Sequence, residues 1–208
     1  MKPQTPKSKP DEGSISKRGH GLKSVRLYGL MSLNGRMARQ IALRQWKESD
    51  LEPFAAMNAD LEVMRFFPKP LTREESAASM ERARARIAER GWGWWAVEVD
   101  DAFAGFTGLG EPRFTSHFTP CVEIGWRLRK EFWGQGIGFE AARQAMAYAF
   151  EKLKLSELVS FTAVVNLRSR RLMERLGFSH DSADDFNHPE IAEGNWLRRH
   201  VLYRKQIS

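Results

Sequence analysis

The 208-residue chain has few of the residues that hold a protein in an oxidising or membranous setting. Its single cysteine, Cys121, excludes an intrachain disulfide framework and a cysteine-based metal site. No apolar stretch is long enough to span a bilayer. The lysines near the N-terminus are not followed by the apolar run of a signal peptide. We therefore expect a soluble, cytoplasmic protein that makes no contact with a membrane.

Basic charge is concentrated at one end of the chain. The formal net charge is +7, and residues 1–37 hold eight lysines and arginines but only two acidic residues. This segment is rich in Lys, Ser, Gly and Pro and has no hydrophobic period, which predicts a leader without regular structure. The leader could hold nucleic acid through counterion release or could simply be solvated, and Met37 could begin a shorter protein. Residues 38–208 are expected to form one domain.

Hydrophobic periodicity predicts both strands and helices in that domain. Ser49 with Glu52, and Thr72 with Glu75, form capping boxes that predict two helix starts. The second helix should be long and exposed and should end at Gly91. A short helix is expected over residues 60–66, before Pro68. Strands are expected near residues 40–46, 93–99, 102–109, 121–128, 158–165 and 201–203. Two further helices are expected over residues 139–153 and 166–177. This order predicts a single α+β domain on a mixed sheet.

A glycine-rich turn carries the strongest chemical signal. Gly134, Gly136 and Gly138 lie between an expected strand and an expected helix. Glycine permits positive φ and close approach of the backbone to a ligand, and a helix start presents unpaired amides and a positive dipole end. The turn therefore predicts a pyrophosphate site, with turn chemistry alone as the alternative. It lacks the dinucleotide fingerprint and the lysine of a P-loop.

Two further stretches accompany this turn. Glu123–Leu128 (EIGWRL) precedes the segment WGQGIGFEA at 133–141, and NLRSRRLMERLGF follows at 166–178. In this order they resemble the GNAT superfamily of N-acetyltransferases, and more closely its ribosomal-protein N-acetyltransferase-like (RimJ/RimL-type) branch. The resemblance covers about residue 40 to the C-terminus. It implies a three-layer α+β fold whose mixed, mostly antiparallel central sheet is splayed at an acetyl-CoA site.

The resemblance also implies which residues hold acetyl-CoA. The backbone of Trp126, Arg127 and Leu128 would pair with the pantetheine arm, and Asn166 would bond near it. The pyrophosphate would be held by the amides of Gly134, Gln135, Gly136, Ile137, Gly138 and Phe139. Trp133 stands where the superfamily usually has Arg or Gln, but the branch often carries Trp there. Because backbone amides bind the phosphates, we expect the side chain at this position to be replaceable.

The catalytic residues are less clearly specified. Many family members place a tyrosine seven residues after the asparagine, as the acid that protonates the leaving thiolate, but Met173 stands at that position here. The branch implies Ser169 as the acid instead, although Asn166 and Ser169 could simply form a helix cap. Glu123 is the candidate base if burial raises its pKa. The alternative is that Glu123 faces solvent or pairs with an arginine.

The acceptor site is not identified by the sequence. Aromatic residues could line it or could pack in the core, namely Phe66, Phe67, Trp92, Trp94 and Trp95. The acidic segment 184–190 could rim a site for a cationic amine or could be solvated. The histidines on the loops and on the last strand are expected to be structural. No group of His, Asp and Glu has metal-ligand spacing, so we expect no metal.

The leading hypothesis is an acetyl-CoA-dependent N-acetyltransferase. The acetyl group would pass to a primary amine, either a protein N-terminal α-amine or a small molecule, by direct attack in a ternary complex. The protein would act as a monomer or homodimer. One alternative is a non-catalytic acyl-CoA-binding sensor, which Met173 motivates. Another is an RNA- or ribosome-associated protein that uses the basic leader.

Overall fold

The structure is a computed structural model that describes residues 27–31 and 39–207. Strands and helices alternate as expected for an α+β domain. The strands are β1 (Leu27–Met31), β2 (Arg39–Arg44), β3 (Trp94–Val99), β4 (Ala102–Gly110), β5 (Glu123–Leu128), β6 (Glu157–Ala163), β7 (Ser179–His180), β8 (Phe186–Asn187) and β9 (Arg199–Gln206). The α-helices are α1 (Leu51–Ala59), α2 (Arg73–Arg90), α3 (Ile137–Glu151) and α4 (Leu167–Arg175). Within the described ranges, no helix is both long and apolar enough to cross a membrane.

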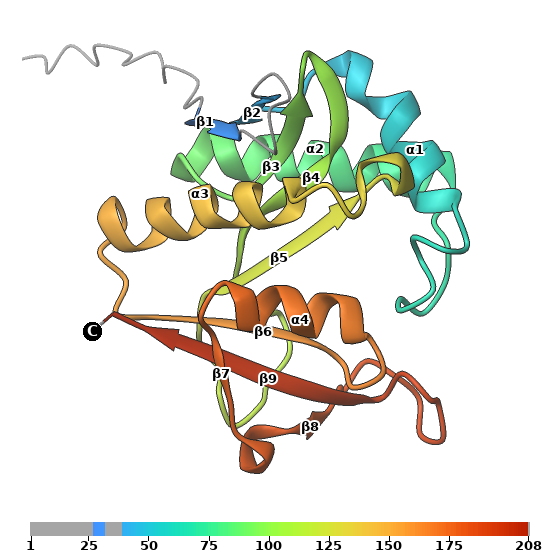
Figure 1. Cartoon of the computed structure of the whole chain (residues 1–208). Coiled ribbons are helices and arrows are strands. Elements are labelled where there is room, and N and C mark those ends of the chain that lie inside the picture. The colour runs from blue at the N-terminus through green and yellow to red at the C-terminus, as the bar shows by residue number, and fades with distance from the viewer. Residues whose placement is uncertain (1–26, 32–38, 208) are drawn as a thin grey trace, which may run out of the picture.

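One sheet runs through the molecule (Figure 1). Its strand order is β1-β2-β3-β4-β5-β6-β9-β7, and β8 also pairs with β9. Every neighbouring pair in the described sheet is antiparallel except β5 and β6, which run parallel. The predicted mixed, mostly antiparallel sheet is therefore confirmed.

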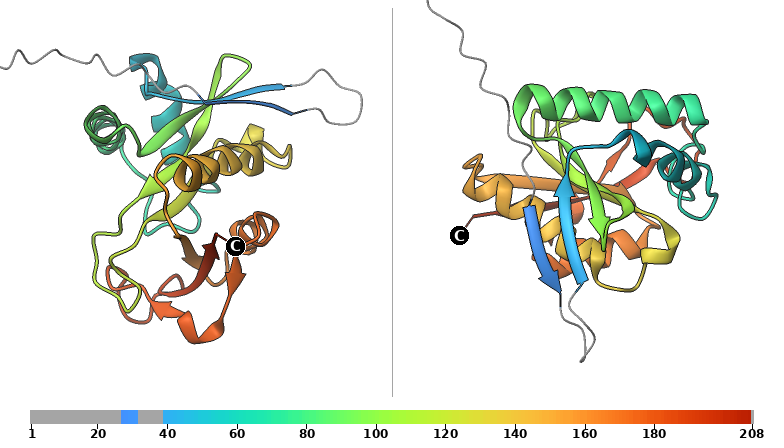
Figure 2. Two further views of the ribbon diagram at one scale, coloured as in Figure 1. Left: turned by 90° about the vertical axis from the view of Figure 1, so that its left-hand side faces the viewer. Right: turned by 90° about the horizontal axis from the view of Figure 1, so that it is seen from above.

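Helices cover both faces of this sheet. Figure 2 shows α3 and α4 on one side, and α1 and α2 on the other. Helix α3 comes close to the sheet because its inward face is built largely of small residues, which are fully buried: Ala141, Ala142, Ala145 and Ala149. The three-layer arrangement places the two helix pairs on opposite sides of β5.

The two halves of the sheet separate after a single point of contact between β5 and β6. Only Glu123 and Val159 are in register across this pair, and beside them Ser160 Oγ donates a hydrogen bond of 2.9 Å to the Ile124 carbonyl. Beyond this point the strands diverge (Figure 1). The other edge of β5 stays paired with β4 over its whole length. The splayed opening is thus bounded by one free strand edge on each side.

Both predicted helices are present, but only one of the two predicted capping boxes forms. Thr72 Oγ1 accepts from the Glu75 amide at 3.2 Å, and Glu75 Oε2 accepts from the Thr72 amide at 2.8 Å, so this capping box opens α2. The box expected at Ser49 does not form. Asp50 instead binds the Lys47 amide at 2.8 Å and the guanidinium of buried Arg44 at 2.6 Å. The Asp50 carboxylate is thus paired with a buried guanidinium and caps no amide of α1.

Two more segments differ from expectation. Residues 61–66 form turns rather than a helix, because Asp60 Oδ1 accepts from the amides of Glu62 and Val63 at 2.7 and 3.1 Å. Leu27–Met31, which we expected within an irregular leader, forms β1 and pairs with β2. The rest of the predicted leader lies outside the described residues.

Candidate functional site

The glycine turn adopts the conformation that its composition predicts. Gly134 and Gly136 have φ values of 71° and 77°, which is the left-handed region that glycine enters without strain. Gly136 is the N-cap of α3, so the helix begins at Ile137, two residues earlier than predicted. The first amides of the helix have no acceptor within it. A Cβ atom built on Gly134 would meet no heavy atom within 4 Å. This open cradle with free amides fits a pyrophosphate.

Side chains around the turn hold its shape. Trp133 Nε1 donates to the Leu128 carbonyl at 2.9 Å, and the Arg168 guanidinium lies 3.9 Å from the Trp133 ring centroid. The indole of Trp133 thus ties the turn to the end of β5, and the expectation that this side chain is replaceable stays a prediction. The side chain of Gln135 bonds to Arg39 and to the Glu131 carbonyl. Only the backbone of Gln135 is left to meet a ligand.

Asn166 lies across the opening from the turn and caps α4. Its Oδ1 accepts from the Ser169 amide at 3.3 Å, and its Nδ2 donates to Thr162 Oγ1 at 3.0 Å. The capping alternative is therefore correct for Asn166. Ser169 stands in the first turn of α4 and lines the cavity described next. Met173 is 1% exposed in the core. Its thioether has no proton to donate, and its side chain does not reach the opening.

A single cavity connects these parts. It has a volume of about 1060 Å³ and extends from Trp133, Asn166 and Ser169 to the α1–α2 side of the sheet, where Phe66 and Phe67 line it. Strand β5 forms part of its wall. The cavity therefore joins the predicted donor site to a space large enough for a second ligand.

Glu123 faces this cavity from the start of β5. Burial disfavours its charged form and raises its pKa to about 7, although Arg86 opposes the shift. The alternative that Glu123 pairs with an arginine is not what the structure shows, since no ion pair to Glu123 forms among the described residues. A carboxyl group with this pKa can accept a proton near neutral pH.

Arg127 also presents its side chain to the cavity, although the sequence implicated only its backbone. Its Nη1 donates to Asn58 Oδ1 at 2.8 Å, and the Phe67 ring centroid lies 3.8 Å from its Cζ atom. Burial lowers the pKa of Arg127 to about 10. Asn58 is fully buried on α1. The sequence contained a sign that Asn58 is buried, because this polar residue stands at a helical position otherwise occupied by apolar residues.

Two histidines form part of the far wall. His188 and His200 line the cavity, and their rings lie 5.0 Å apart among phenylalanines of the same cluster. Burial lowers the pKa of His200 to about 4 and also lowers the pKa of His188. Both imidazoles are therefore mainly neutral at pH 7, and the structural role expected of them stays a prediction. In the part of the chain that the structure describes, no group of acidic, His or Cys residues could hold a metal ion.

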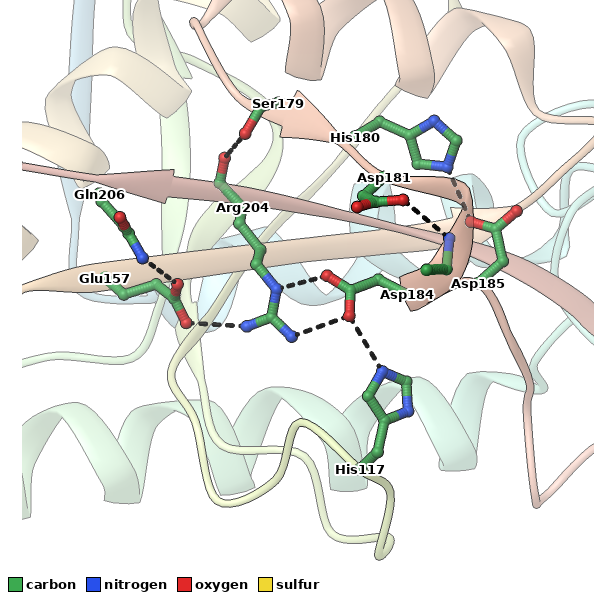
Figure 3. Close-up of polar contacts among 10 residues, drawn as sticks. His117, Glu157, Ser179, His180, Asp181, Asp184, Asp185, Arg204 and Gln206 are labelled. Atoms are coloured by element: carbon green, nitrogen blue, oxygen red, sulfur yellow. Dashed lines mark hydrogen bonds and ion pairs between the residues drawn. The ribbon is translucent and has the colours of Figure 1, made fainter.

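The acidic segment 184–190 divides between the cavity and the surface beside β9. Figure 3 shows Arg204 held between Glu157 and Asp184, with bonds of 2.9 and 2.7 Å. Asp184 also contacts His117, and Asp185 contacts His180 at 2.7 Å. Asp184 and Asp185 are thus paired with cations and imidazoles and do not line the cavity, whereas Glu190 of the same segment does. Of the acidic residues in the segment, only Glu190 could form part of an acidic entrance for a cationic amine.

The aromatic candidates divide between the two readings. Phe66, Phe67 and Trp94 line the cavity, whereas Trp95 is fully buried in the core. Trp92 lies beneath Arg86 and Arg90, which approach its ring at 5.5 and 5.9 Å. Trp94 and Trp95 lie in different places because neighbouring side chains on a strand point to opposite faces of the sheet.

Residues 40–179 match the model of the acetyltransferase (GNAT) domain family. The chain is 32% identical over 131 residues to the FsC-acetyl coenzyme A-N(2)-transacetylase of Aspergillus fumigatus, a match covering 60% of this chain and 56% of that protein. It is 46% identical over 57 residues to the putative ribosomal N-acetyltransferase YdaF of Bacillus subtilis, covering 27% of this chain and 31% of the relative. The chain thus spans about half or less of these two relatives.

The fold is also similar to those of solved acetyltransferase structures. A GNAT-family acetyltransferase from Bacillus anthracis superposes with a TM-score of 0.66 at 21% identity, over 80% of this chain and 94% of that one. This likeness confirms the predicted fold, including the splayed sheet, at a low level of sequence identity. The YdaF match agrees with the ribosomal-type branch that the sequence resembles.

Proposed function

Because this chain belongs to the GNAT acetyltransferase family, we propose that it transfers an acetyl group from acetyl-CoA to a primary amine. One observation carries the proposal: Trp133, which directly precedes the open cradle at the start of α3, and Glu123 line the same cavity. The transacetylase relative names acetyl coenzyme A as its donor and a nitrogen as its acceptor. A sensor would need the cradle but not a carboxyl group poised near neutral pH.

The donor end of the site is built from backbone. The amides of Ile137, Gly138 and Phe139 would hold the pyrophosphate, with Gly134, Gln135 and Gly136 shaping the turn. The free edge of β5 at Trp126, Arg127 and Leu128 would pair with the pantetheine arm, and Asn166 would lie beside it. Acetyl-CoA supplies the acetyl thioester when it is bound. These contacts orient the reactants, which is a large part of the acceleration in such a reaction.

Glu123 would act on the acceptor end. It takes the proton that the amine nitrogen loses as the new carbon–nitrogen bond forms, directly or through a water. A backbone amide of β5 stabilises the oxyanion. The carbon–sulfur bond then breaks, and the thiolate leaves with the electron pair. A thiol of ordinary pKa, roughly 8.5, leaves with little help, so Ser169 would contribute only a modest amount as the donor of a proton to sulfur.

The direct test is an acetyl-transfer assay. The purified full-length protein is incubated with labelled acetyl-CoA and a panel of amines that includes N-terminal peptides and small molecules. We expect label to reach at least one class of amine. Tight binding of CoA without transfer to any amine would support the sensor alternative instead. The relatives motivate both acceptor classes, since one name refers to a ribosomal activity and the other to a small-molecule nitrogen.

Two further proposals concern assembly and the basic leader. A monomer or homodimer is sufficient, because one chain supplies both ends of the cavity. An association of the leader with RNA or the ribosome can be tested by salt-titrated RNA binding of chains that start at Met1 and at Met37. Equal affinity of the two chains would remove any role for the leader.

A further inference from the structure

Arg127 is a buried cation without an acidic partner. Its Nε atom is buried and has no hydrogen-bond partner in the described structure. Its hydrogen-bond acceptor is the neutral amide oxygen of Asn58, at 2.8 Å. None of the ion pairs formed by residues 39–207 includes Arg127. Because guanidinium stays protonated in proteins, a buried arginine normally has a carboxylate or another anion beside it.

A chain of buried groups fixes the direction of the guanidinium. Asn58 Nδ2 donates to Ser76 Oγ at 3.1 Å, and Ser76 Oγ donates to the Thr72 carbonyl at 2.8 Å. Asn58 and Ser76 are both fully buried. These hydrogen bonds anchor Nη1 of Arg127 to α1 and α2. They do not involve the opposite edge of the guanidinium, which carries Nε and Nη2. That edge presents two parallel donors, the arrangement that matches a carboxylate.

Aromatic rings restrict how a ligand can approach. The ring centroids of Phe67 and Phe106 lie 3.8 and 5.4 Å from Cζ of Arg127, and both residues line the cavity. A planar cation stacked in this way is held in place and offers its edges for hydrogen bonding. A carboxylate in the guanidinium plane would therefore bond through Nη2, and pairing with Nε as well requires the groups that cover this buried atom to move aside.

Arg127 and Glu123 are separated along the cavity wall. Both belong to the same face of β5, and four strand residues span about 13 Å. Gly125 lies between them, where a Cβ atom would stand 3.2 Å from the Trp94 ring, so this ring covers the strand there. Arg86, and not Arg127, is the cation that acts on the pKa of Glu123. The wall thus presents a proton acceptor, an aromatic surface and a cation in succession.

The cavity as a whole has an excess of positive charge. Its lining includes the arginines Arg65, Arg82, Arg86, Arg113, Arg127 and Arg168. Four glutamates line it as well, and two of these are already paired: Glu62 with Lys130, and Glu111 with Arg86 and Arg90. A cationic acceptor would be disfavoured by this field, and an anionic one would be attracted to it.

We propose that Arg127 binds a carboxylate of the acceptor, so that the substrate is an amine carrying a carboxylate group spaced away from the reacting nitrogen. The proposal rests on the acetyl-transfer function proposed above. It names the class of acceptor, and it assigns to Arg127 a contact with substrate in place of a packing role. The amine would be acetylated near Glu123 while the carboxylate meets the Nε and Nη2 edge.

The experiment compares acids with their amides. The probes are ω-amino acids with one to seven methylene groups and the matching carboxamides, assayed at one pH with saturating acetyl-CoA. A charge-assisted bidentate contact predicts that kcat/KM favours the acid over the amide by about tenfold or more at the best chain length. The Arg127→Met variant should reduce this ratio to about one, and Arg127→Lys should give an intermediate value. Arg84→Met, which removes an equal charge from the outer surface of α2, should preserve the ratio.

The outcomes separate this proposal from the function on which it rests. A wild-type protein that acetylates amides as well as acids at every length would overturn the role of Arg127 and leave acetyl transfer standing. No transfer to any amine would remove both. Preference for O-phosphoethanolamine over ethanolamine, without a preference for carboxylates, would replace the carboxylate by a phosphate and refute the assignment. A wild-type ratio that persists in Arg127→Met would assign the carboxylate to another arginine of the cavity and overturn the proposal. CoA affinity measured on the same variant shows whether it is folded.

Discussion

The raised pKa of Glu123 leads to opposite effects of one substitution on activity and stability. If Glu123 is the base, it must be ionised to act, and with a pKa of about 7 its ionised fraction rises about tenfold between roughly pH 6 and pH 8. The acceptor amine also loses its proton as pH rises. Below about pH 7 the logarithm of kcat/KM should therefore climb with two proton dissociations rather than one.

The variant Glu123→Gln should remove one of these two dissociations. We expect kcat/KM to fall by about 10² or more at pH 8, which is the low end of the usual contribution of a general base. The remaining pH dependence should be that of the amine alone. The assay is a pH profile of kcat/KM from about pH 5.5 to pH 9 for both proteins, with CoA affinity measured in parallel to show that the donor site is intact.

The stability of the same pair of proteins should change in the other direction. Burial raises the pKa of Glu123 from 4.5 to about 7, so the folded state holds one proton more than the unfolded state between these values. Stability gained by this proton is present below about pH 4.5 and is lost as pH rises through about pH 7. The full change is about 3 kcal/mol. Glutamine carries no charge, so the variant should be the more stable protein at pH 8, with a smaller difference at pH 5.

Urea unfolding at the two pH values measures this effect. A variant that is both less active and less stable at pH 8 would contradict the reasoning, because it would mean that the glutamate charge is stabilised in the folded protein. An unchanged inflection near pH 7 in the activity profile of the variant would show that another group titrates there. Either result would refute Glu123 as a buried general base.

The remaining predictions concern the cradle and the helices behind it. Gly136→Glu should abolish CoA binding measured by calorimetry, because a carboxylate would occupy the phosphate site, whereas Gly194→Glu, at a matching φ of 78° with open space around it, should leave binding unchanged. Thr72→Ala removes the confirmed cap of α2 and should lower the free energy of unfolding by about 1 kcal/mol in urea titrations; no change would show that the cap is redundant. Asn58→Leu removes the hydrogen-bond acceptor of Arg127 Nη1 and one of the two hydrogen bonds of Ser76, and should cost about 2 kcal/mol; a cost below that of Thr72→Ala would contradict the buried hydrogen bonds that anchor Arg127.

Much of the fold could be predicted from local pattern. The capping box at Thr72, the positive φ at Gly91 and the alternation over Trp94–Val99 depend on neighbours in the chain, and each was predicted. The errors have long-range causes. Asp50 accepts a hydrogen bond from Arg44 on β2, and Arg44 also donates one to Glu98 on β3 at 2.5 Å. A capping rule that considers only four successive residues cannot include such partners.

The proposed donor site could be predicted from the sequence because it is made of backbone. Glycines at 134, 136 and 138 and a helix start are local properties, and the structure has the cradle where the pattern predicted it. Glu123 could be nominated from its place on β5, but its pKa depends on which side chains surround it. That environment belongs to the packed structure, since helices α1 and α2 remove water from a strand far along the chain.

The acceptor side was decided by tertiary structure alone. Residues at 58, 67 and 127 have no pattern in common, yet they form the pocket of Arg127 because α1, the following turn and β5 meet there. The same packing directs Asp184 toward Arg204, while Glu190 of the same acidic segment lines the cavity. The sequence by itself determined how the chain presents amides to a phosphate, because that requires only local backbone geometry. Which charges face the second ligand depended on the packing of distant segments, because an electrostatic environment is set by neighbours in space.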